Sequence, residues 1–247
     1  MKDQGQRRGV IGILGGMGPE ATILMMSRLL AATPARDDSD HLPLLVDSNT
    51  QVPSRIAHLI EGTGVDPTPV LIDMARRLVT SGADVLAMPC NTAHSYYDAI
   101  AAAVPVPMLN MVELSARAAH GRSATGPVGI LASPAVEITG VFARAFEALG
   151  REVIYPADRD GLLGAIRAIK SGRAGDALPV LKAAMVELAG RGAQVAVIGC
   201  SEFSIVAPRL ADSPLALVDS LDVLVAACVG FAGGGTSSSN TGVTLTQ

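Results

Sequence analysis

One stretch of the sequence decides the fold, and it reads Leu78-Val79-Thr80-Ser81-Gly82-Ala83-Asp84-Val85-Leu86-Ala87-Met88-Pro89-Cys90-Asn91-Thr92. Residues 84–88 in its middle form a short apolar run, which is typical of a buried strand. Residues 95–104, which follow it, are rich in alanine and predict a helix. Cys90 therefore lies where a strand ends and a helix begins. In an open α/β sheet this is the carboxyl edge, where ligands bind.

Cys90 is a candidate functional thiol because of this position. The N-terminus of a helix presents free N–H groups and a partial positive charge, and both favour the thiolate over the thiol. The alternative is a small cysteine that only packs in the core, which is the more common fate of a single cysteine. The rest of the chain favours the functional interpretation.

The pattern around Cys90 occurs a second time around Cys200, which lies 110 residues further along the chain. The second copy reads Leu188-Ala189-Gly190-Arg191-Gly192-Ala193-Gln194-Val195-Ala196-Val197-Ile198-Gly199-Cys200-Ser201-Glu202. Shorter resemblances support the repeat, namely 12–14 with 129–131 and 107–110 with 215–219. Two halves built alike would form a pseudo-twofold molecule, with the two thiols facing each other across the interface between the halves.

The composition indicates the class of protein. Of the 247 residues, 49% are hydrophobic and only 3% are aromatic, as suits parallel strands covered by helices on both faces. A net charge of −4 without a run of Lys or Arg argues against a nucleic-acid partner. No apolar stretch is long enough to span a bilayer, and the polar N-terminus lacks a signal-type segment. We therefore expect a cytoplasmic protein without a membrane partner.

The cysteines do not indicate cross-links or a metal. There are three of them, an odd number without close spacing, so they do not form a disulfide framework. No Cys-x-x-Cys or His-x-x-x-His pattern suggests zinc, and we expect no metal site. Cys228 lies on the apolar face of a predicted helix and is interpreted as a packing residue.

The order of apolar runs and helical patterns predicts an α/β fold. Strands are expected at 10–14, 42–46, 84–88, 106–110, 128–132, 152–155, in the run that ends at Cys200, and at 217–219. Helices are expected at 21–32, 69–81, 95–104, 113–120, from 134 to 149, and at 160–170, 178–191 and 221–231. The last helix should cross back onto the first half, because the repeat requires it.

We expect two pseudo-symmetric lobes, each a mostly parallel sheet flanked by helices, with an active site in the inter-lobe cleft. Residues 1–111 and 220–232 would form the first lobe, and residues 112–219 the second. Residues 233–247 are rich in Gly, Ser and Thr without periodicity and predict a flexible tail.

Two loops of the first half carry candidate binding residues. The loop Gly15-Gly16-Met17-Gly18 lacks the third glycine of a dinucleotide-binding loop, so it suits a small carboxylate, with a plain tight turn as the alternative. The stretch 47–55 is dense in hydrogen-bonding side chains. Its Arg55 is a natural bidentate partner for a carboxylate, and the alternative is a surface arginine on a solvated turn.

The chain resembles the cofactor-independent aspartate/glutamate racemase family. The resemblance covers about residues 9–231, and three motifs carry it: Gly12-Ile13-Leu14-Gly15-Gly16-Met17-Gly18-Pro19, Cys90-Asn91-Thr92-Ala93-His94 and Gly199-Cys200-Ser201-Glu202. The loop Asp47-Ser48-Asn49-Thr50-Gln51 is similar to the branch that acts on aspartate, glutamate or both. The resemblance implies two lobes of similar α/β fold, a site in the cleft, no pyridoxal phosphate or other cofactor, no metal, and often a homodimer.

The resemblance also implies roles for individual residues. Cys90 and Cys200 would be the two catalytic thiols, and Arg55 and Lys170 the basic pair for the substrate carboxylates. The other substrate-binding residues are expected to be Met17, Asn49, Gln51, Asn91, Thr92, Ser201 and Glu202. Ser201 stands where the family more often has threonine, and Gly18 where its first loop often has serine. These departures concern the choice of substrate more than the thiols.

The expected reaction is the interconversion of L- and D-aspartate, glutamate or both. It needs a proton removed from one face of Cα and another delivered to the opposite face, which two thiols on opposite walls can do. Asn91 and Thr92 would hold the α-carboxylate. His94 could tune Cys90 or simply bond to the backbone, and Glu202 could accept the substrate ammonium or cap its helix.

The same architecture leaves other functions open. Hydantoin racemases and maleate isomerases share it, and maleate isomerisation also uses paired cysteines. Arylmalonate decarboxylation needs only one cysteine, so the presence of two argues against it. Outside the enzymes, Cys90 and Cys200 could form a redox switch on an amino-acid-binding protein.

Overall fold

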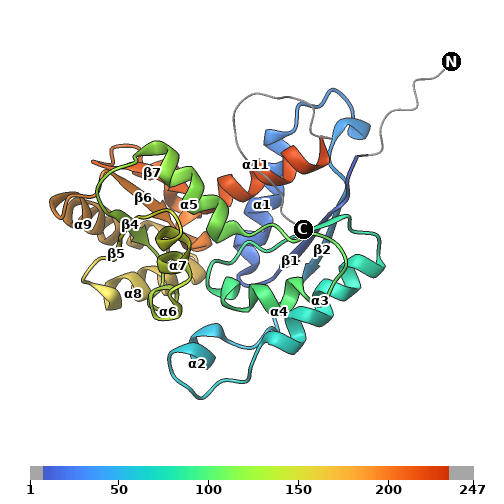
Figure 1. Ribbon diagram of the computed structural model, residues 1–247, viewed down its shortest axis with the longest axis horizontal. Helices are drawn as coiled ribbons and strands as arrows, with labels where there is room; N and C mark the ends of the chain where they lie inside the picture. Colours follow the sequence, from blue (N-terminus) through green and yellow to red (C-terminus); the bar gives the residue numbers. More distant parts are fainter. Residues whose placement is uncertain (1–7, 234–247) are drawn as a thin grey trace.

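Two parallel β-sheets form the centres of two lobes that lie side by side (Figure 1). The computed structural model describes residues 8–233, so the tail predicted at 233–247 falls, apart from its first residue, outside the described residues. The first sheet has the order β2-β1-β3, with β1 at Ile11–Gly15, β2 at Leu44–Ser48 and β3 at Val85–Ala87. The second has the order β5-β4-β6-β7, with β4 at Val128–Leu131, β5 at Val153–Ile154, β6 at Val195–Ile198 and β7 at Ala216–Asp219.

Met108 takes the fourth position of the first sheet, where the sequence predicts a full strand at 106–110. Only a single parallel bridge forms there, between Leu86 and Met108. The Leu86 N–H donates to the Pro107 carbonyl at 2.9 Å, and the Leu109 N–H donates to the Leu86 carbonyl at 2.8 Å. Pro107 has no N–H to donate, so the pairing cannot extend into a longer ladder. With this segment included, the two sheets share one strand order, as the sequence repeat predicts.

Helices flank both sheets. In the first lobe they are α1 (Pro19–Ala32), α2 (Arg55–Leu59), α3 (Thr68–Thr80) and α4 (Tyr97–Ala101). In the second lobe they are α6 (Pro134–Thr139), α7 (Val141–Glu147), α8 (Arg159–Lys170), α9 (Ala177–Gly190) and α10 (Ser201–Val206). Two further helices, α5 (Met111–Arg122) and α11 (Ser220–Ala232), lie between the lobes (Figure 1). Short 3₁₀ turns are η1 (Asp38–Asp40), η2 (Thr92–Tyr96), η3 (Ala174–Asp176) and η4 (Ala207–Leu210).

The helix predicted from 134 to 149 is in fact two helices. Gly140 ends α6 in the left-handed conformation, with φ +63°, and the chain starts again as α7. The helix predicted at 95–104 is also shorter than expected. It begins as the 3₁₀ turn η2 and continues as α4, which ends at Ala101.

Gly12 and Gly129 show that the two copies of the repeat also pack a helix against a strand in the same way. A Cβ added to Gly12 would lie 3.3 Å from the Cβ of Leu78 on α3, and one added to Gly129 would lie 3.4 Å from the Cβ of Leu188 on α9. Both distances are at or below ordinary van der Waals contact, so glycine lets each helix lie close against the first strand of its sheet. Leu78 and Leu188 correspond in the two copies of the repeat.

The Gly-Ala pair in each copy is a helix stop that leads into a strand. Gly82 and Gly192 take positive φ values of +100° and +88°, directly after α3 and α9. The alanine after each glycine donates its N–H back to the helix, to the carbonyl of Leu78 at 3.0 Å or Leu188 at 3.1 Å. This is the Schellman type of helix end, and the next residues enter β3 or β6.

The helix α11 returns to the first lobe, as the repeat predicts. Its Leu224 and Cys228 are buried in one cluster with Ile11 of the first sheet. The helix α5 makes the opposite crossing, because its Val112 is buried in one cluster with Val128 of the second sheet. Cys228 is fully buried there, as expected for a packing residue.

No helix in the described part of the chain combines the length and the apolar character that crossing a membrane requires.

Gly16 gives a test of how the first glycine loop is held. Its φ is +89°, and an added Cβ would lie 2.4 Å from the backbone of Asn49. We expect Gly16→Ala to lower the free energy of unfolding by more than about 2 kcal/mol, because left-handed strain and a backbone clash add together. Urea denaturation measures this.

The matched control is Gly172→Ala. Gly172 also has a positive φ, +79°, but nothing lies within 4 Å of an added Cβ. It should show only the strain, about 1–2 kcal/mol. Equal losses in the two variants would contradict a tight contact between Gly16 and Asn49.

Candidate active site

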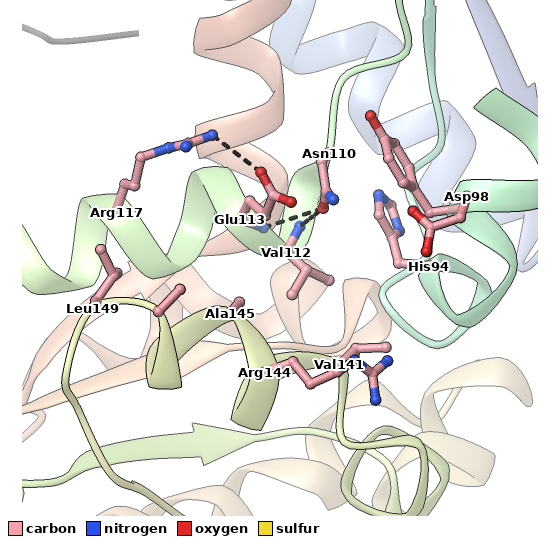
Figure 2. Close-up of a pocket in the computed structure, with 12 residues that line it drawn as sticks. His94, Asp98, Asn110, Val112, Glu113, Arg117, Val141, Arg144, Ala145 and Leu149 are labelled. Atoms are coloured by element: carbon pink, nitrogen blue, oxygen red, sulfur yellow. Dashed lines mark hydrogen bonds and ion pairs between the residues drawn. The ribbon is translucent and has the colours of Figure 1, made fainter. Parts of the chain in front are cut away.

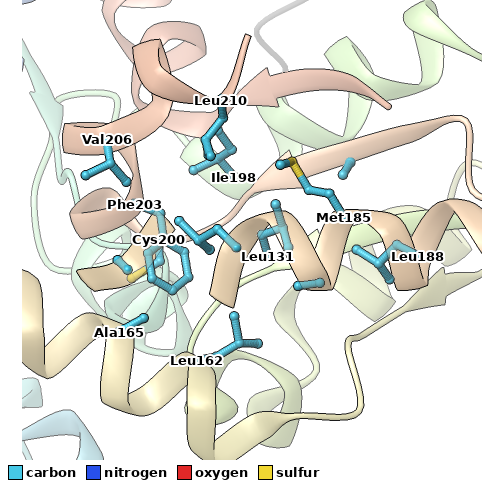
Figure 3. Packing of buried hydrophobic residues seen from close by; sticks show 14 of the residues in the cluster. Leu131, Leu162, Ala165, Met185, Leu188, Ile198, Cys200, Phe203, Val206 and Leu210 are labelled. Carbon is cyan, nitrogen blue, oxygen red and sulfur yellow. The ribbon is translucent and has the colours of Figure 1, made fainter. Parts of the chain in front are cut away.

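The two cysteines of the repeat lie just beyond the carboxyl ends of equivalent strands. Cys90 follows β3 and Cys200 follows β6, and neither forms a disulfide. Each is only 8% exposed. Cys90 packs in one cluster with Met17 and Tyr96. Cys200 packs beside Phe203 in the core of the second lobe (Figure 3).

A buried hydrogen bond joins the two cysteine loops across the lobes. The Ser201 hydroxyl donates to the Pro89 carbonyl at 2.7 Å. Pro89 precedes Cys90, and Ser201 follows Cys200. The two strand ends that the repeat predicts to face each other are therefore in direct contact.

Asn91 makes a second connection between the lobes. Its amide Nδ2 donates to the Ser220 hydroxyl at 2.9 Å, and that hydroxyl donates to the Ile198 carbonyl at 2.7 Å. Ile198 is the last residue of β6, two residues before Cys200. The hydroxyls of Thr92 and Ser133 lie 3.3 Å apart and add a third contact.

The surroundings of Cys200 favour the protonated thiol. Burial raises its pKa well above the ordinary value, and the neighbouring Glu202 carboxylate adds to the rise. Cys90 also raises it, so the two thiols lie within electrostatic reach of each other. The backbone N–H of Glu202 acts in the opposite direction by donating a hydrogen bond to the sulfur.

Glu202 and Lys170 extend this arrangement toward the surface. The Cys200 thiol donates to Glu202 Oε2 at 3.1 Å, and the Lys170 ammonium lies 3.2 Å from Glu202 Oε1. The Lys170 side chain is 46% exposed, whereas that of Glu202 is 11% exposed. A Cβ on Gly18 would lie 3.4 Å from Glu202 Oε1, so the first glycine loop approaches the same carboxylate from the other lobe.

Arg55 carries a charge without a carboxylate partner among residues 8–233. It is the first residue of α2, after the N-cap Ser54. Its Nη1 donates to the carbonyls of Val52 at 3.3 Å and Pro53 at 3.0 Å, and its buried Nε has no partner in the described chain. The helix α2 contacts α6 of the second lobe, so Arg55 lies on an element that bridges the two lobes.

The other predicted residues of the first lobe form the loops around this region. Asn49 accepts a hydrogen bond from the Gln51 N–H at 2.9 Å and so shapes its own turn. The Gln51 side chain is exposed and its amide reaches only Thr50. Met17 is buried in the cluster that contains Cys90. The role of these residues as substrate ligands stays a prediction.

His94 bonds to the backbone, which is one of the two interpretations that the sequence left open. Its Nδ1 lies 2.9 Å from the Cys90 carbonyl, and the Met111 N–H donates to its Nε2 at 3.0 Å. Nε2 is therefore the acceptor, and Nδ1 carries the proton. Burial outweighs the hydrogen bonding to the Cys90 carbonyl and lowers the pKa of His94 to about 4. The neutral imidazole ties the Cys90 loop to the start of α5.

Three residues of the site were not predicted from the sequence. Ser133 and Ser220 contribute the hydroxyls described above, and Tyr96 is buried beside Cys90 with its own hydroxyl unpartnered within the described chain. Ser133 occupies the second-lobe loop that corresponds to the first glycine loop, so the repeat itself pointed toward it. Tyr96 lies two residues after His94, just outside the motif that begins at Cys90. Its missing partner, however, is visible only in three dimensions.

The pocket drawn in Figure 2 does not contain either thiol. It has a volume of about 370 Å³ and lies between α4, α5 and α7. His94 forms part of its wall, with Glu113 and Arg117 of α5 and Arg144 of α7 around it (Figure 2). The thiols themselves are enclosed at the lobe interface.

Solved structures similar to this one share its two-lobed architecture. The aspartate racemase of Picrophilus torridus superposes with a TM-score of 0.81 at 24% identity, covering 91% of this chain and 94% of that one. The glutamate racemase isoform RacE1 of Bacillus anthracis has a TM-score of 0.68 at 17% identity, covering 93% of this chain and 84% of that one. The class defined by this fold is that of two-lobed α/β proteins with a parallel sheet in each lobe.

Sequence comparison identifies the family. The model of the family described as Asp/Glu/Hydantoin racemase matches residues 14–228. The chain is 26% identical over 216 residues to the broad specificity amino-acid racemase RacX of Bacillus subtilis (strain 168), covering 85% of this chain and 92% of that protein. The chain therefore belongs to the Asp/Glu/hydantoin racemase family, and it is an isomerase of that class.

The buried imidazole predicts a pH-dependent stability. His94 stays neutral in the folded protein down to about pH 4, while the unfolded chain takes up a proton near pH 6.5. The folded state thus loses stability as pH falls from about 6.5 to about 4, by up to roughly 3 kcal/mol. We expect His94→Gln to be less stable at neutral pH but to show a shallower decline, measured by urea denaturation across this range. An unchanged slope would contradict a neutral buried His94.

The contact between Cys200 and Glu202 predicts a shifted thiol titration. In a Cys90→Ser, Cys228→Ala background only Cys200 remains as a thiol, and its ionisation can be followed by the ultraviolet absorbance of the thiolate. Adding Glu202→Gln removes a negative charge beside the sulfur, so the pKa of Cys200 should fall. Glu113→Gln, far from the sulfur on α5, is the matched control and should leave the titration unchanged. A titration that does not move in Glu202→Gln would show that burial alone sets the pKa.

Proposed function

We propose that this protein is a cofactor-independent amino-acid racemase that interconverts the L and D forms of aspartate, glutamate or both. The observation that carries the proposal is the direct contact between the loops of Cys90 and Cys200. The Ser201 hydroxyl donates to the Pro89 carbonyl at 2.7 Å, which brings equivalent thiols of two repeated lobes to one interface. Relatives named as aspartate, glutamate and broad specificity amino-acid racemases support it.

Racemisation explains why two thiols are needed. One thiolate removes the proton from Cα, and the thiol on the other side delivers a proton to the opposite face of the carbanion. The first sulfur ends as a thiol and the second as a thiolate. The reverse reaction uses the same two groups with their roles exchanged, so neither is a permanent acid or base.

The surroundings of the two thiols define a starting state for this cycle. The Cys200 thiol donates a hydrogen bond to Glu202 Oε2 at 3.1 Å, which favours its protonated form, so Cys200 starts as the acid. Cys90, which follows β3, is then the group that removes the proton from the enantiomer whose Cα–H faces the first lobe. After turnover Cys200 is a thiolate beside a carboxylate. The pair returns to its starting state either by the reverse reaction or by exchange with solvent, in which Cys90 loses a proton and Cys200 gains one.

Cations at the edges of the interface would offset the negative charge of the substrate. Arg55 has no carboxylate partner in the described chain, and Lys170 reaches Glu202 at 3.2 Å with nearly half its side chain exposed. One substrate carboxylate can pair directly with Arg55, and another can replace Glu202 as the partner of Lys170. Charge neutralisation of this kind makes the Cα–H more acidic in an enclosed site.

The lack of a carboxylate partner for Arg55 in the described chain also helps to distinguish between the alternative substrates. A hydantoin ring carries no carboxylate, so it would leave the Arg55 charge uncompensated at the interface, and this favours acidic amino acids. Maleate has two carboxylates and suits the same cations, so only a substrate panel separates it. Within the family an enzyme is favoured over a redox switch. A cytoplasmic homodimer remains part of the proposal on the strength of the sequence resemblance.

The central test is the loss of each thiol. Cys90→Ser and Cys200→Ser should each lower the racemisation rate by a factor of about 1,000 or more, because serine is a much weaker acid than cysteine. Circular dichroism of L- and D-aspartate and of L- and D-glutamate follows the reaction without added cofactor. Cys228→Ala, in the core of the first lobe, should keep the parent rate. Two single variants that both racemise at the parent rate would refute the two-thiol scheme.

The same assay decides between substrates. Purified protein is incubated with the four acidic enantiomers, with a hydantoin and with maleate. Racemisation of aspartate or glutamate is the expected result. Turnover of the hydantoin or of maleate alone would replace the proposed substrate with that compound.

A further inference from the structure

Unpartnered buried polar atoms gather around Cys90. In the part of the chain that the structure describes, six buried side-chain nitrogen or oxygen atoms lack a hydrogen-bond partner. Three of them belong to this region: Nε of Arg55, Oδ1 of Asn91 and Oη of Tyr96. Buried polar groups in proteins are nearly always paired, so a cluster of unpaired ones marks a place that a ligand completes.

Tyr96 is the residue of this set that no motif assigns. It is the last residue of η2, six positions after Cys90, and it is 92% buried because only 8% of its surface is exposed. Its side chain shares a buried cluster with Cys90 and Met17. Its ring also contacts the His58 ring of α2, with 6.1 Å between centroids and an angle of 46°. His58 lies one turn after Arg55 on the same helix.

The Tyr96 hydroxyl lies within electrostatic reach of both the Cys90 thiol and the Arg55 cation. Burial raises the pKa of Tyr96 to about 12, Asp66 and Cys90 add to the rise, and Arg55 opposes it. The hydroxyl therefore keeps its proton at neutral pH and is available as a donor. Asp66 itself is occupied, since its carboxylate accepts from the N–H and hydroxyl of Thr68.

The polarity of the unpaired atoms indicates the chemistry of the missing group. Arg55 Nε is a donor with a positive charge, and the Tyr96 hydroxyl, which is within electrostatic reach of Arg55, is a second donor. Two donors and a cation that no protein carboxylate neutralises fit an anion with planar oxygens, which is a carboxylate. Asn91 Oδ1 is an acceptor next to Cys90, and it suits an ammonium group nearer to the reacting carbon.

We propose that the Tyr96 hydroxyl, together with Arg55, binds the side-chain carboxylate of the acidic amino acid and thereby selects acidic over neutral substrates. This inference rests on the racemase function proposed above. The side-chain carboxylate is assigned because Tyr96 shares the buried cluster of Cys90 in the first lobe, whereas Cys200 belongs to the core cluster of the second lobe. The Cα must lie between the two sulfurs. A neutral amino acid would leave both donors unpaired in a closed site, and such a site discriminates strongly against it.

Tyr96→Phe tests the role of the oxygen alone. Because Oη has no protein partner in the described chain, its removal should not lower the melting temperature. The KM for L-aspartate or L-glutamate should rise about 10- to 100-fold, with kcat changed less than about threefold. Inhibition by L-asparagine and L-glutamine, which lack the side-chain carboxylate, should change much less.

Tyr155→Phe is the matched control. The Tyr155 hydroxyl is also buried without a partner in the described chain, but it lies against the core of the second lobe with Phe142 and Phe146. This variant should keep the parent KM. Equal effects in the two variants would overturn the proposal, and so would an unchanged KM in Tyr96→Phe. Equal weakening of acidic and amide ligands would also overturn it, because the hydroxyl would then contact the α-carboxylate.

Ligand-induced thermal shifts separate this inference from the racemase function. A parent protein that is stabilised by aspartate or glutamate but racemises neither would refute the proposed reaction. If Tyr96→Phe then lost that stabilisation, the role of Tyr96 in carboxylate binding would stand. A parent protein that neither racemises nor binds these acids overturns both.

Discussion

The hydrogen bond from Ser201 to the Pro89 carbonyl is the interaction on which the candidate site depends. It is buried, it spans 112 positions of the chain, and it joins the residue after one cysteine to the residue before the other. A buried carbonyl left without its donor costs roughly 1–3 kcal/mol, so the contact fixes the relative position of the lobes as well as of the thiols. A few residues away, the hydrogen bonds from Asn91 to Ser220 and from Ser220 to Ile198 also connect the Cys90 loop to β6.

The polar groups around the cysteines fall into two sets that separate architecture from binding. His94 is satisfied at both ring nitrogens, and Ser201 and Ser220 are satisfied through their hydroxyls. Asn91 belongs to both sets, because its Nδ2 donates to Ser220, which in turn bonds to Ile198 of the second lobe, while its Oδ1 has no partner in the described chain. The satisfied groups hold the backbone at the lobe interface. The unsatisfied groups lie in the region of Cys90, where a bound ligand would supply the missing hydrogen bonds.

Repeated lobes have produced chemically unequal thiols. Both cysteines follow a buried parallel strand at the same register of the repeat. In the first lobe the next residues are Asn91 and Thr92, which carry no charge. In the second lobe the Glu202 carboxylate accepts a hydrogen bond from the Cys200 thiol, and the partly exposed Lys170 forms an ion pair with that carboxylate. In the proposed racemisation one pair of thiols acts on both enantiomers, so the two sulfurs need comparable positions. Their surroundings need not be identical, because each sulfur returns to its starting state after one forward and one reverse turnover.

Enclosure of the sulfurs also has a consequence for turnover. Both are 8% exposed, and α2 of the first lobe contacts α6 of the second. In the proposed reaction a polar substrate has to reach both sulfurs, so access to them would require the lobe interface to open. In such an enclosed site a substrate charge would interact with Arg55 more strongly than it does in water.

Much of the framework was encoded locally and could be predicted from the sequence. Apolar runs predict the strands, and the Gly-Ala pairs of the repeat prove in the structure to be local signals too, because Gly82 and Gly192 adopt positive φ where α3 and α9 end. The repeat then located Cys90 and Cys200 at equivalent strand ends. Local signals failed where geometry intervened, as at Pro107, which limits a predicted strand to one bridge, and at Gly140, which divides a predicted helix.

The partners of the polar residues were decided only by the tertiary structure. Nothing in the sequence pairs Ser201 with Pro89, or Asn91 with Ser220, since these residues are more than 100 positions apart. Nor does any pattern show that the Tyr96 hydroxyl is buried without a partner. Secondary structure depends on neighbours along the chain, whereas hydrogen-bond satisfaction in a core depends on which distant groups the packing brings within reach.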